Sequence, residues 1–171
     1  MNKFEIVKDE HRKNYLTTPT AEIDERIVLS DGSKRYVPEI KLPEPSTISS
    51  AGSDFYVPIK TKILPGHSAV VWTDIKAKIN EGEVLLLFIR SSLAIKKGLI
   101  LTNQVGVIDA DYYNNPDNDG NIGIAITNTS GTVVTIEAGD KIAQGICIPF
   151  IPMGETATTN KRKGGIGSTG N

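Results

Sequence analysis

Residues 60–90 read "KTKILPGHSAVVWTDIKAKINEGEVLLLFIR", and short apolar runs alternate with turn signals throughout this stretch. The turn signals are Pro65-Gly66 and Asn80-Glu81-Gly82, and the runs between them are rich in β-branched residues. This punctuation is typical of the short strands of a sandwich or barrel. The stretch therefore predicts strands at residues 60–64, 68–73, 75–79 and 83–90.

The same pattern continues downstream, where Ser130-Gly131 and Gly139-Asp140 supply further turn signals. Four more strands are predicted there. Eight short strands are the number found in a jelly roll. The sequence therefore predicts an all-β protein with a distorted jelly-roll architecture, whose last four strands lie at residues 99–102, 122–128, 132–136 and 141–149.

Two segments depart from this pattern. "RSSLAIKKGL", at 90–99, predicts one short helix, with Ser91 or Ser92 as its cap, lysines in its last turn and Gly98 at its end. "RIVLSDGSKRYV", at 26–37, predicts a hairpin whose turn is Asp31-Gly32. We interpret the hairpin as part of an N-terminal extension that packs on the same domain.

Composition excludes several classes of protein. The chain has 171 residues, enough for one domain, and 19 basic residues nearly balance 20 acidic ones, for a net charge of -1. This balance does not predict binding to nucleic acid or to an acidic membrane. There is no apolar run long enough to span a bilayer, and "MNKFEIVKDEHRK" at the N-terminus is charged throughout. The single Cys147, which lies in an apolar run, predicts an inert core thiol and a cytoplasmic protein.

The chain offers little material for several kinds of chemistry. Its only histidines are His11 and His67, so neither a histidine triad nor a Cys/His zinc site is predicted. The terminal "GGIGSTG" is not a Walker A loop, because Gly167 stands before Ser168 where that motif needs lysine. Carboxylate and hydroxyl groups therefore remain as the candidates for catalysis.

The stretch "GVIDADYYNNPDNDG", at residues 106–120, begins as a buried strand and then places Asp109 and Asp111 before two tyrosines. One interpretation is a polar turn that ends a strand, the usual role of Asp beside Asn, Pro and Gly. The other is a catalytic site. The loop after Tyr112 is predicted to be solvated, although contact with a neighbouring subunit is an alternative.

Five stretches occur in the order of the motifs of a known family. They are "AGSDF" at 51–55, "RSSLAIKKG" at 90–98, "NQVGVIDADY" at 103–112, "GDKIAQ" at 139–144 and "RKGGIGSTG" at 162–170. Together they resemble the trimeric dUTP pyrophosphatases, or dUTPases. The resemblance covers about three quarters of the chain, from Pro43 to the C-terminus.

The resemblance implies a fold, an activity and an assembly. It implies a β-clip jelly roll in a homotrimer with shared active sites, which hydrolyses dUTP to dUMP and pyrophosphate with Mg²⁺. It also implies three parts of the chain: an N-terminal extension at 1–42, the jelly roll at 43–155 and a flexible glycine-rich lid at 156–171. No membrane and no nucleic acid are implied as partners, and a regulatory protein partner is left open.

The resemblance also implies roles for individual residues. Asp109 activates the water that attacks the α-phosphate, and Tyr112 lies against the deoxyribose. A positioned general base is typically worth about 10²- to 10⁴-fold in rate. The phosphates are contacted by Arg90, with contributions from Ser91, Ser92 and Gln144. For the two serines capping alone is the alternative, and for Gln144 it is a bond to buried backbone.

Uracil recognition is implied for the hairpin "NQVGVID", in which Asn103 and main-chain groups of Gly106, Val107 and Ile108 satisfy the base edge. Gly106 would exclude thymine by allowing close backbone approach, and a plain turn glycine is the alternative. Asp54 would contact Mg²⁺ through water. Arg162 would reach the γ-phosphate from the lid, and the remaining lid residues that contact substrate would be Ile166, Gly167, Ser168 and Thr169.

Some residues depart from the family pattern. Ile166 stands where the family usually has phenylalanine, so stacking on uracil is lost. "RSSLA" is shared with the dCTP deaminases, which have the same fold, but Ala125 stands where they need a glutamate. A diphosphatase is therefore preferred to a deaminase or a bifunctional relative. A nucleotide-sensing regulatory protein of the same fold remains the alternative from another class.

Overall fold

The computed structural model describes residues 1–14, 26–28, 34–36, 38–154, 162 and 164. All strand pairs in these residues are antiparallel. The larger sheet has the order β11-β9-β14-β5-β4. Its strands are β4 (Glu44–Pro45), β5 (Ser53–Tyr56), β9 (Glu83–Ile89), β11 (Gly106–Asp109) and β14 (Lys141–Pro149).

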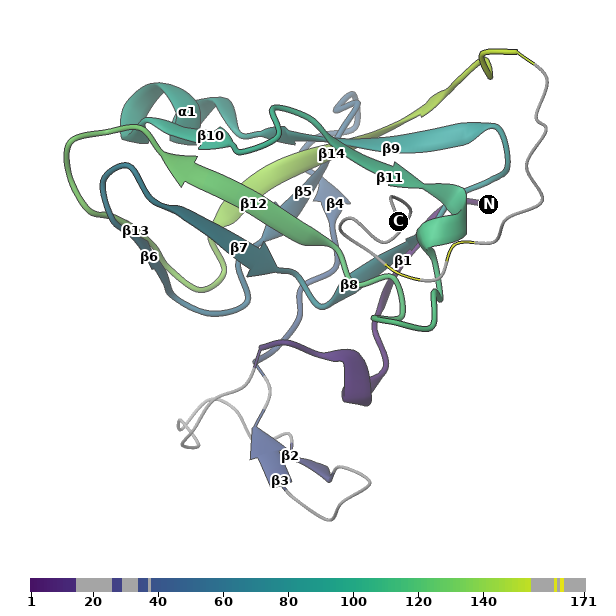
Figure 1. Cartoon of the computed structure of the whole chain (residues 1–171), viewed down its shortest axis with the longest axis horizontal. Helices are drawn as coiled ribbons and strands as arrows, with labels where there is room; N and C mark the ends of the chain where they lie inside the picture. The colour runs from purple at the N-terminus through teal and green to yellow at the C-terminus, as the bar shows by residue number, and fades with distance from the viewer. Residues whose placement is uncertain (15–25, 29–33, 37, 155–161, 163, 165–171) are drawn as a thin grey trace.

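The smaller sheets complete the body of the molecule. One has the order β10-β12-β7, and β13 pairs with β6. In Figure 1, β9, β11 and β14 run above β7 and β12. The bounds are β6 (Thr61–Ile63), β7 (Ser68–Trp72), β10 (Leu99–Leu101), β12 (Gly123–Asn128) and β13 (Val134–Ile136).

A single apolar core joins these sheets. The side chains of Phe55, Leu87, Ile126 and Ile142 are at most 2% exposed and belong to one contiguous cluster. These residues come from different strands, so each strand buries one face on the others. The prediction of an all-β protein is confirmed, and all eight strands expected from the turn signals are present.

The N-terminal segment pairs with this body. Strand β1 (Lys3–Ile6) lies antiparallel to β8 (Ile75–Lys78), and Phe4 meets Phe55 edge to face with ring centroids 5.4 Å apart. The short 3-10 helix η1 (Asp9–His11) follows. β2 (Arg26–Val28) pairs with β3 (Lys34–Tyr36), as the hairpin prediction requires, and lies below the sheets in Figure 1. The predicted turn Asp31-Gly32 lies outside the described residues, and so does the predicted lid at 156–171 apart from Arg162 and Gly164. The predicted boundaries of the three parts stay a prediction.

The predicted helix is confirmed as α1 (Ser91–Lys97), which ends at Gly98 in the left-handed conformation, with φ of 64°. The prediction that Ser91 or Ser92 caps it is wrong. Arg90 occupies the N-cap position in extended conformation, and no side chain there caps a free amide. In the part of the chain that is described, no helix is long and apolar enough to cross a membrane.

Two further expectations about burial are wrong. Cys147 is exposed rather than buried in the core, because it lies near the end of β14, where the residues from Cys147 to Phe150 all face outward. Val107 is 58% exposed, so β11 is not a buried strand. Among the described strands β11 pairs only with β9, so it is an edge strand and the main-chain groups along its other edge have no strand partner.

Candidate active site

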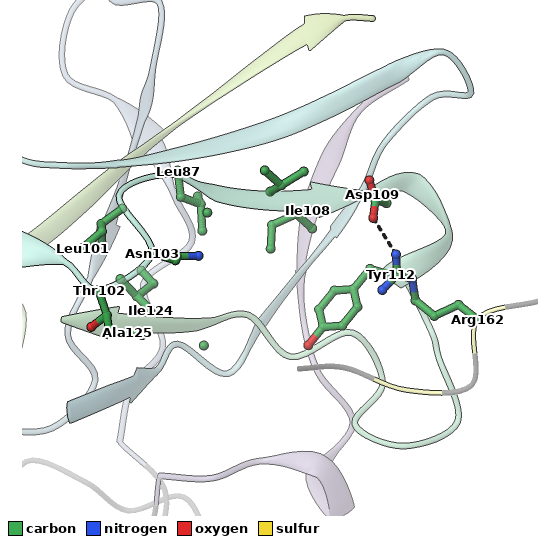
Figure 2. Close-up of a pocket in the computed structure, with 13 residues that line it drawn as sticks. Leu87, Leu101, Thr102, Asn103, Ile108, Asp109, Tyr112, Ile124, Ala125 and Arg162 are labelled. Atoms are coloured by element: carbon green, nitrogen blue, oxygen red, sulfur yellow. Dashed lines mark hydrogen bonds and ion pairs between the residues drawn. The ribbon is translucent and has the colours of Figure 1, made fainter. Parts of the chain in front are cut away.

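A cavity of about 310 Å³ lies beside β11, between this strand and β12. Figure 2 shows Asn103 and Asp109 toward its two ends, with Leu87 and Ile108 along one wall. The chain forms the cavity because the turn after β10 carries it from the smaller sheet to the edge of the larger one. The lining residues are Leu87, Leu101, Thr102, Asn103, Gly106, Val107, Ile108, Asp109, Tyr112, Gly123, Ile124, Ala125 and Arg162.

Gly106 is part of β11 and not of a turn. A Cβ atom at this position would lie 3.0 Å from Cβ and 3.2 Å from Cδ1 of Leu87, which faces it across the strand pair. A contact this short would force Leu87 to move. Since Leu87 also lines the cavity, any side chain at position 106 would change the shape of the pocket wall.

Asp109 lines the mouth of the cavity, and a second carboxylate, Asp111, shares with it the cavity-lining Arg162. Asp109 ends β11, Asp111 lies in the following 3-10 helix η2 (Ala110–Tyr112), and their side chains are 51% and 59% exposed. Arg162 joins them: its Nη2 lies 2.5 Å from Asp109 Oδ2 and its Nε lies 2.7 Å from Asp111 Oδ1. The dashed line in Figure 2 marks the first of these contacts.

Arg162 is more buried than its two partners, at 18% side-chain exposure. Burial on its own lowers the pKa of Arg162, but the hydrogen bond with Asp111 and the charges of both carboxylates outweigh it and the pKa is raised. The guanidinium therefore stays charged. Its Cζ lies 5.8 Å from the ring centroid of Tyr112, within the range of a cation–π contact.

Tyr112 forms the floor below this ion pair. The residue is 8% exposed, and its ring borders the cavity while its hydroxyl points away from Asp109 (Figure 2). Burial raises the pKa of Tyr112, and the hydrogen bond from Asn118 and the charge of Arg162 only partly oppose this. The hydroxyl is therefore neutral and keeps its proton for donation.

A second cavity, of about 590 Å³, lies around helix α1 and is rich in cations. Arg90 and Lys141 contribute from the strand ends, and Lys41, Lys96 and Lys97 add three ammonium groups. So many cations at one cavity suit a polyanion. The lining residues are Lys41, Tyr56, Arg90, Ser92, Leu93, Lys96, Lys97, Gly139, Asp140 and Lys141.

Asp54 pairs with two of the cations of this second cavity. Its carboxylate is 3% exposed, pairs with Arg90, lies 2.8 Å from Lys141 Nζ and accepts a hydrogen bond from Ser46 at 2.5 Å. Burial on its own raises the pKa of Asp54, but hydrogen bonds from Lys141, Ser46 and Arg90 outweigh it, and the pKa is lowered. Asp54 is therefore ionised, and its two oxygens are occupied by protein cations.

The remaining predicted phosphate residues lie near Asp54 or at the surface. Gln144 stands directly opposite Asp54 in the pairing of β14 with β5, and it is half-buried. Ser91 is exposed and lines neither of these two cavities, whereas Ser92 lines the second.

The structure thus divides the predicted site residues between two places. One cavity brings together Asn103, Gly106, Val107, Ile108, Asp109, Tyr112 and Arg162, and the other has Arg90 and Ser92. The two cavities share no lining residue. The predicted lid residues Ile166, Gly167, Ser168 and Thr169 lie outside the described residues.

Sequence reasoning missed several residues that shape these cavities. The sequence places Asp111 beside Asp109 but does not indicate its pairing with Arg162, because the two residues are 51 positions apart. Lys41 and Lys141 were missed as cations of the second cavity, although Lys141 lies inside the quoted motif "GDKIAQ". Burial of the loop after Tyr112 was also missed: Asn115, Asp119 and Asn121 are at most 4% exposed, so the prediction of a solvated loop is wrong.

Comparison with known sequences shows which family the chain belongs to. The sequence model described as dUTPase matches residues 38–170. The chain is 43% identical over 133 residues to the deoxyuridine 5'-triphosphate nucleotidohydrolase of Lactococcus lactis. The matched region covers 77% of this chain and 89% of that protein. It is 37% identical over 138 residues to the protein of the same name from Chlamydia pneumoniae, with 76% and 91% covered.

Solved structures give the same result. The crystal structure of dUTPase from Streptococcus mutans matches with a TM-score of 0.66 and 42% identity, covering 76% of this chain and 98% of that one. The dUTPase from phage phi11 of S. aureus matches with a TM-score of 0.62 over 94% of this chain and 97% of that one. At 22% identity the second likeness concerns the fold alone.

Proposed function

The chain belongs to the dUTPase family and is a dUTP diphosphatase, and on this premise we propose that a water molecule activated by Asp109 attacks the α-phosphate of dUTP in line. The products are dUMP and pyrophosphate. The observation that carries this proposal is the position of Asp109, an accessible carboxylate at the mouth of a cavity of nucleoside size.

The cavity beside β11 is proposed to hold the deoxyuridine. Its walls are mostly apolar, and the side-chain amide of Asn103 points into it (Figure 2). A site that pairs the polar edge of uracil leaves buried groups unpaired with cytosine, which suits discrimination between the two bases. Gly106 allows Leu87 to lie close to β11, and we propose that this close wall excludes the methyl group of thymine.

The cationic cavity around α1 is proposed to hold the phosphates. Arg90 is oriented there by its ion pair with Asp54, so that its planar guanidinium is fixed before the ligand arrives. Ser92 and Gln144 are proposed as neutral donors nearby. For Ser91 we propose phosphate contact through its main-chain amide alone, since this residue does not line the cavity.

Separation of the two cavities supports a shared site. A single nucleotide needs the base pocket and the phosphate cations at one place, yet within one chain these groups line separate cavities. We therefore propose that the nucleoside cavity of one copy meets the cationic cavity of another in a homotrimer. A closed ring of identical subunits forms three such sites.

Mg²⁺ is proposed as the cofactor, as is typical of dUTPases. The described residues contain no cluster of three or more acidic, His or Cys side chains suited to a metal ion. The ion would therefore be held mainly by the triphosphate oxygens, and when bound it would neutralise charge that develops on them. Asp54 does not fit the predicted water-mediated contact, because its oxygens already pair with Arg90 and Lys141. We assign it instead as the counter-ion of Arg90.

The lid is proposed to act through Arg162. In the described structure Arg162 is already at the mouth of the nucleoside cavity, paired with Asp109 and Asp111. Contact with the γ-phosphate would require this side chain to exchange its carboxylate partners for phosphate oxygens. We propose that Ile166, Gly167, Ser168 and Thr169 close over the nucleotide after this exchange.

The deaminase alternative is weakened by the wall of the nucleoside cavity. Ala125 lines it from β12, so no carboxylate stands at the position where a deaminase needs its glutamate. A methyl group cannot carry protons to or from a cytosine amine. This observation favours diphosphatase activity over deamination.

A substrate panel tests the proposed function. Purified chain would be incubated with Mg²⁺ and dUTP, dCTP, UTP or dTTP, and pyrophosphate and ammonia would be measured. The proposal predicts pyrophosphate from dUTP alone at substantial rate. Ammonia from dCTP would support the deaminase, and nucleotide binding without any turnover would support a regulatory protein.

A further inference from the structure

The hydroxyl of Tyr112 is held by the loop that follows it in the sequence. It donates a hydrogen bond to the main-chain oxygen of Asn121 at 2.8 Å. It also accepts one from Nδ2 of Asn118 at 2.8 Å. The hydroxyl group is therefore held both as a donor and as an acceptor, while the ring itself borders the nucleoside cavity.

Asn118 is itself fixed in one orientation. Its Oδ1 accepts hydrogen bonds from Nδ2 of Asn115 at 2.7 Å and from the amide of Gly120 at 3.0 Å. Since both partners are donors, the oxygen of Asn118 must face them and its NH₂ group must face Tyr112. Asn118 is 9% exposed, so water competes little for these bonds.

The loop is in turn tied to the N-terminal segment. Oδ2 of Asp119 accepts hydrogen bonds from the amide of Lys8 and from Nζ of Lys76, each at 2.8 Å. The side chain of Asn121 donates to Asp74 at 2.9 Å and to the main-chain oxygen of His11 at 3.1 Å. A continuous polar network thus runs from residues 8–11, which precede the family match at 38–170, to the ring of Tyr112.

We propose that Asn118 is a positioning residue that sets the selectivity for deoxyribose by fixing Tyr112, an inference that rests on the proposed function. The ring of Tyr112 would exclude the 2'-hydroxyl group of a ribose only if the ring cannot move back by the width of one oxygen atom. Close-packed interiors resist such a shift when the ring is held at its far end. The N-terminal segment thereby contributes to substrate selection without touching the nucleotide.

Two variants test this inference through the ratio of kcat/KM for dUTP to kcat/KM for UTP. Tyr112→Phe keeps the ring and removes the hydroxyl, and Asn118→Ala removes the donor. A net hydrogen bond is worth roughly a fivefold effect, so each variant should lower the ratio by about that factor. The double variant should lower it no further than Tyr112→Phe does, because Tyr112→Phe already removes the hydrogen bond that Asn118 donates.

Asn128→Ala is the matched control. Like Asn118, Asn128 is buried and supports a turn, since its amide donates to the main-chain oxygens of Ile63 and Thr132 at 2.9 and 2.8 Å. It lies outside the nucleoside cavity. It should lower the melting temperature and leave the ratio unchanged.

The outcomes separate the two proposals. If the unmodified chain does not prefer dUTP to UTP, the proposed function fails. If it does prefer dUTP and Tyr112→Phe keeps the full ratio, the role of Asn118 is overturned even if Asn118→Ala does not fold. An equal fall in the ratio for Asn128→Ala would also overturn it, because general loss of stability would then explain the effect.

Discussion

Arg162 Nη2 lies 2.5 Å from Asp109 Oδ2, so the carboxylate proposed as general base is paired with a cation from the C-terminal segment. The same guanidinium binds Asp111 through Nε and lies over the ring of Tyr112. Three residues of the motif "IDADY" therefore contact one arginine that lies 50 to 53 positions further along the sequence. This arrangement holds the arginine beside the groups with which it is proposed to act.

Arg162→Ala should lower kcat/KM for dUTP by roughly 10- to 100-fold, the range expected for loss of one charge-assisted hydrogen-bond pair. Steady-state kinetics with dUTP would measure this. Lys62→Ala, which removes an exposed cation on β6, serves as the control and should change kcat/KM less than twofold. An Arg162→Ala variant with normal kinetics would exclude a role of this side chain in the reaction.

Asp54→Asn should lower stability and raise KM. The carboxylate is buried, but Arg90 and Lys141 are 30% and 38% exposed, so loss of these charge-assisted hydrogen bonds costs roughly 1.5–3 kcal/mol. Urea unfolding and the KM for dUTP would be measured together. Glu137→Gln, which breaks the exposed pair with Lys60, should cost less than about 1 kcal/mol. Equal effects of the two variants would contradict the assignment of Asp54 as the counter-ion of Arg90.

Gly120→Ala should destabilise the loop below Tyr112. Gly120 has φ of 83°, and an added Cβ would lie 2.8 Å from the main-chain oxygen of Tyr112. Backbone strain of this kind costs roughly 1–3 kcal/mol. Gly131→Ala is the matched control, because a Cβ there meets no atom within 4 Å. Thermal unfolding would compare the two, and a Gly120→Ala variant as stable as Gly131→Ala would contradict the described loop.

Stability should fall in acid in a defined window. Burial on its own raises the pKa of Asp119, but hydrogen bonds from Lys76 and Lys8 and their charges outweigh it, so the folded pKa is lowered. The pKa of Asp54 is lowered as well. In the unfolded chain an Asp titrates near about 3.9, so the unfolded state binds more protons just below that value. The stabilisation by both groups is present above that pH and is lost as the pH falls through the folded pKa values.

Urea midpoints measured from pH 7 down to pH 3 would check this dependence. Asp119→Asn should have a lower midpoint at pH 7, since it leaves Lys76 buried without its charge partner, and a shallower fall below about pH 4. A variant that falls as steeply as the unmodified chain would show that Asp119 does not cause the acid sensitivity.

Much of the fold was predictable because its signals are local. Turn residues such as Pro65-Gly66 and apolar runs such as residues 83–90 predict strands without any knowledge of their partners. Gly98 likewise predicts the end of α1 from backbone conformation alone. The exposure of Cys147 was not predictable in this way, because it depends on how far β14 extends beyond the core.

The candidate site was predictable only where its residues are close in sequence. Asn103, Gly106, Asp109 and Tyr112 fall within ten residues and line one cavity. The loop after Tyr112 was misjudged because Asn115, Asn118 and Asn121 are typical of solvated turns. The loop is held against the body by distant partners, since Asn121 bonds to His11 and Asp74 and Asp119 bonds to Lys8 and Lys76. No local pattern indicates such distant contacts.

Asp109 is proposed to activate the attacking water, and single-turnover hydrolysis of dUTP by Asp109→Asn and Asp111→Asn tests this role. Each substitution removes one carboxylate partner of Arg162. Both variants should bind dUTP within a few-fold of the unmodified chain. Asp109→Asn should lose about 10²- to 10⁴-fold in rate, whereas Asp111→Asn should lose less than about tenfold. Near-normal turnover by Asp109→Asn, or equal losses in the two variants, would contradict this role of Asp109.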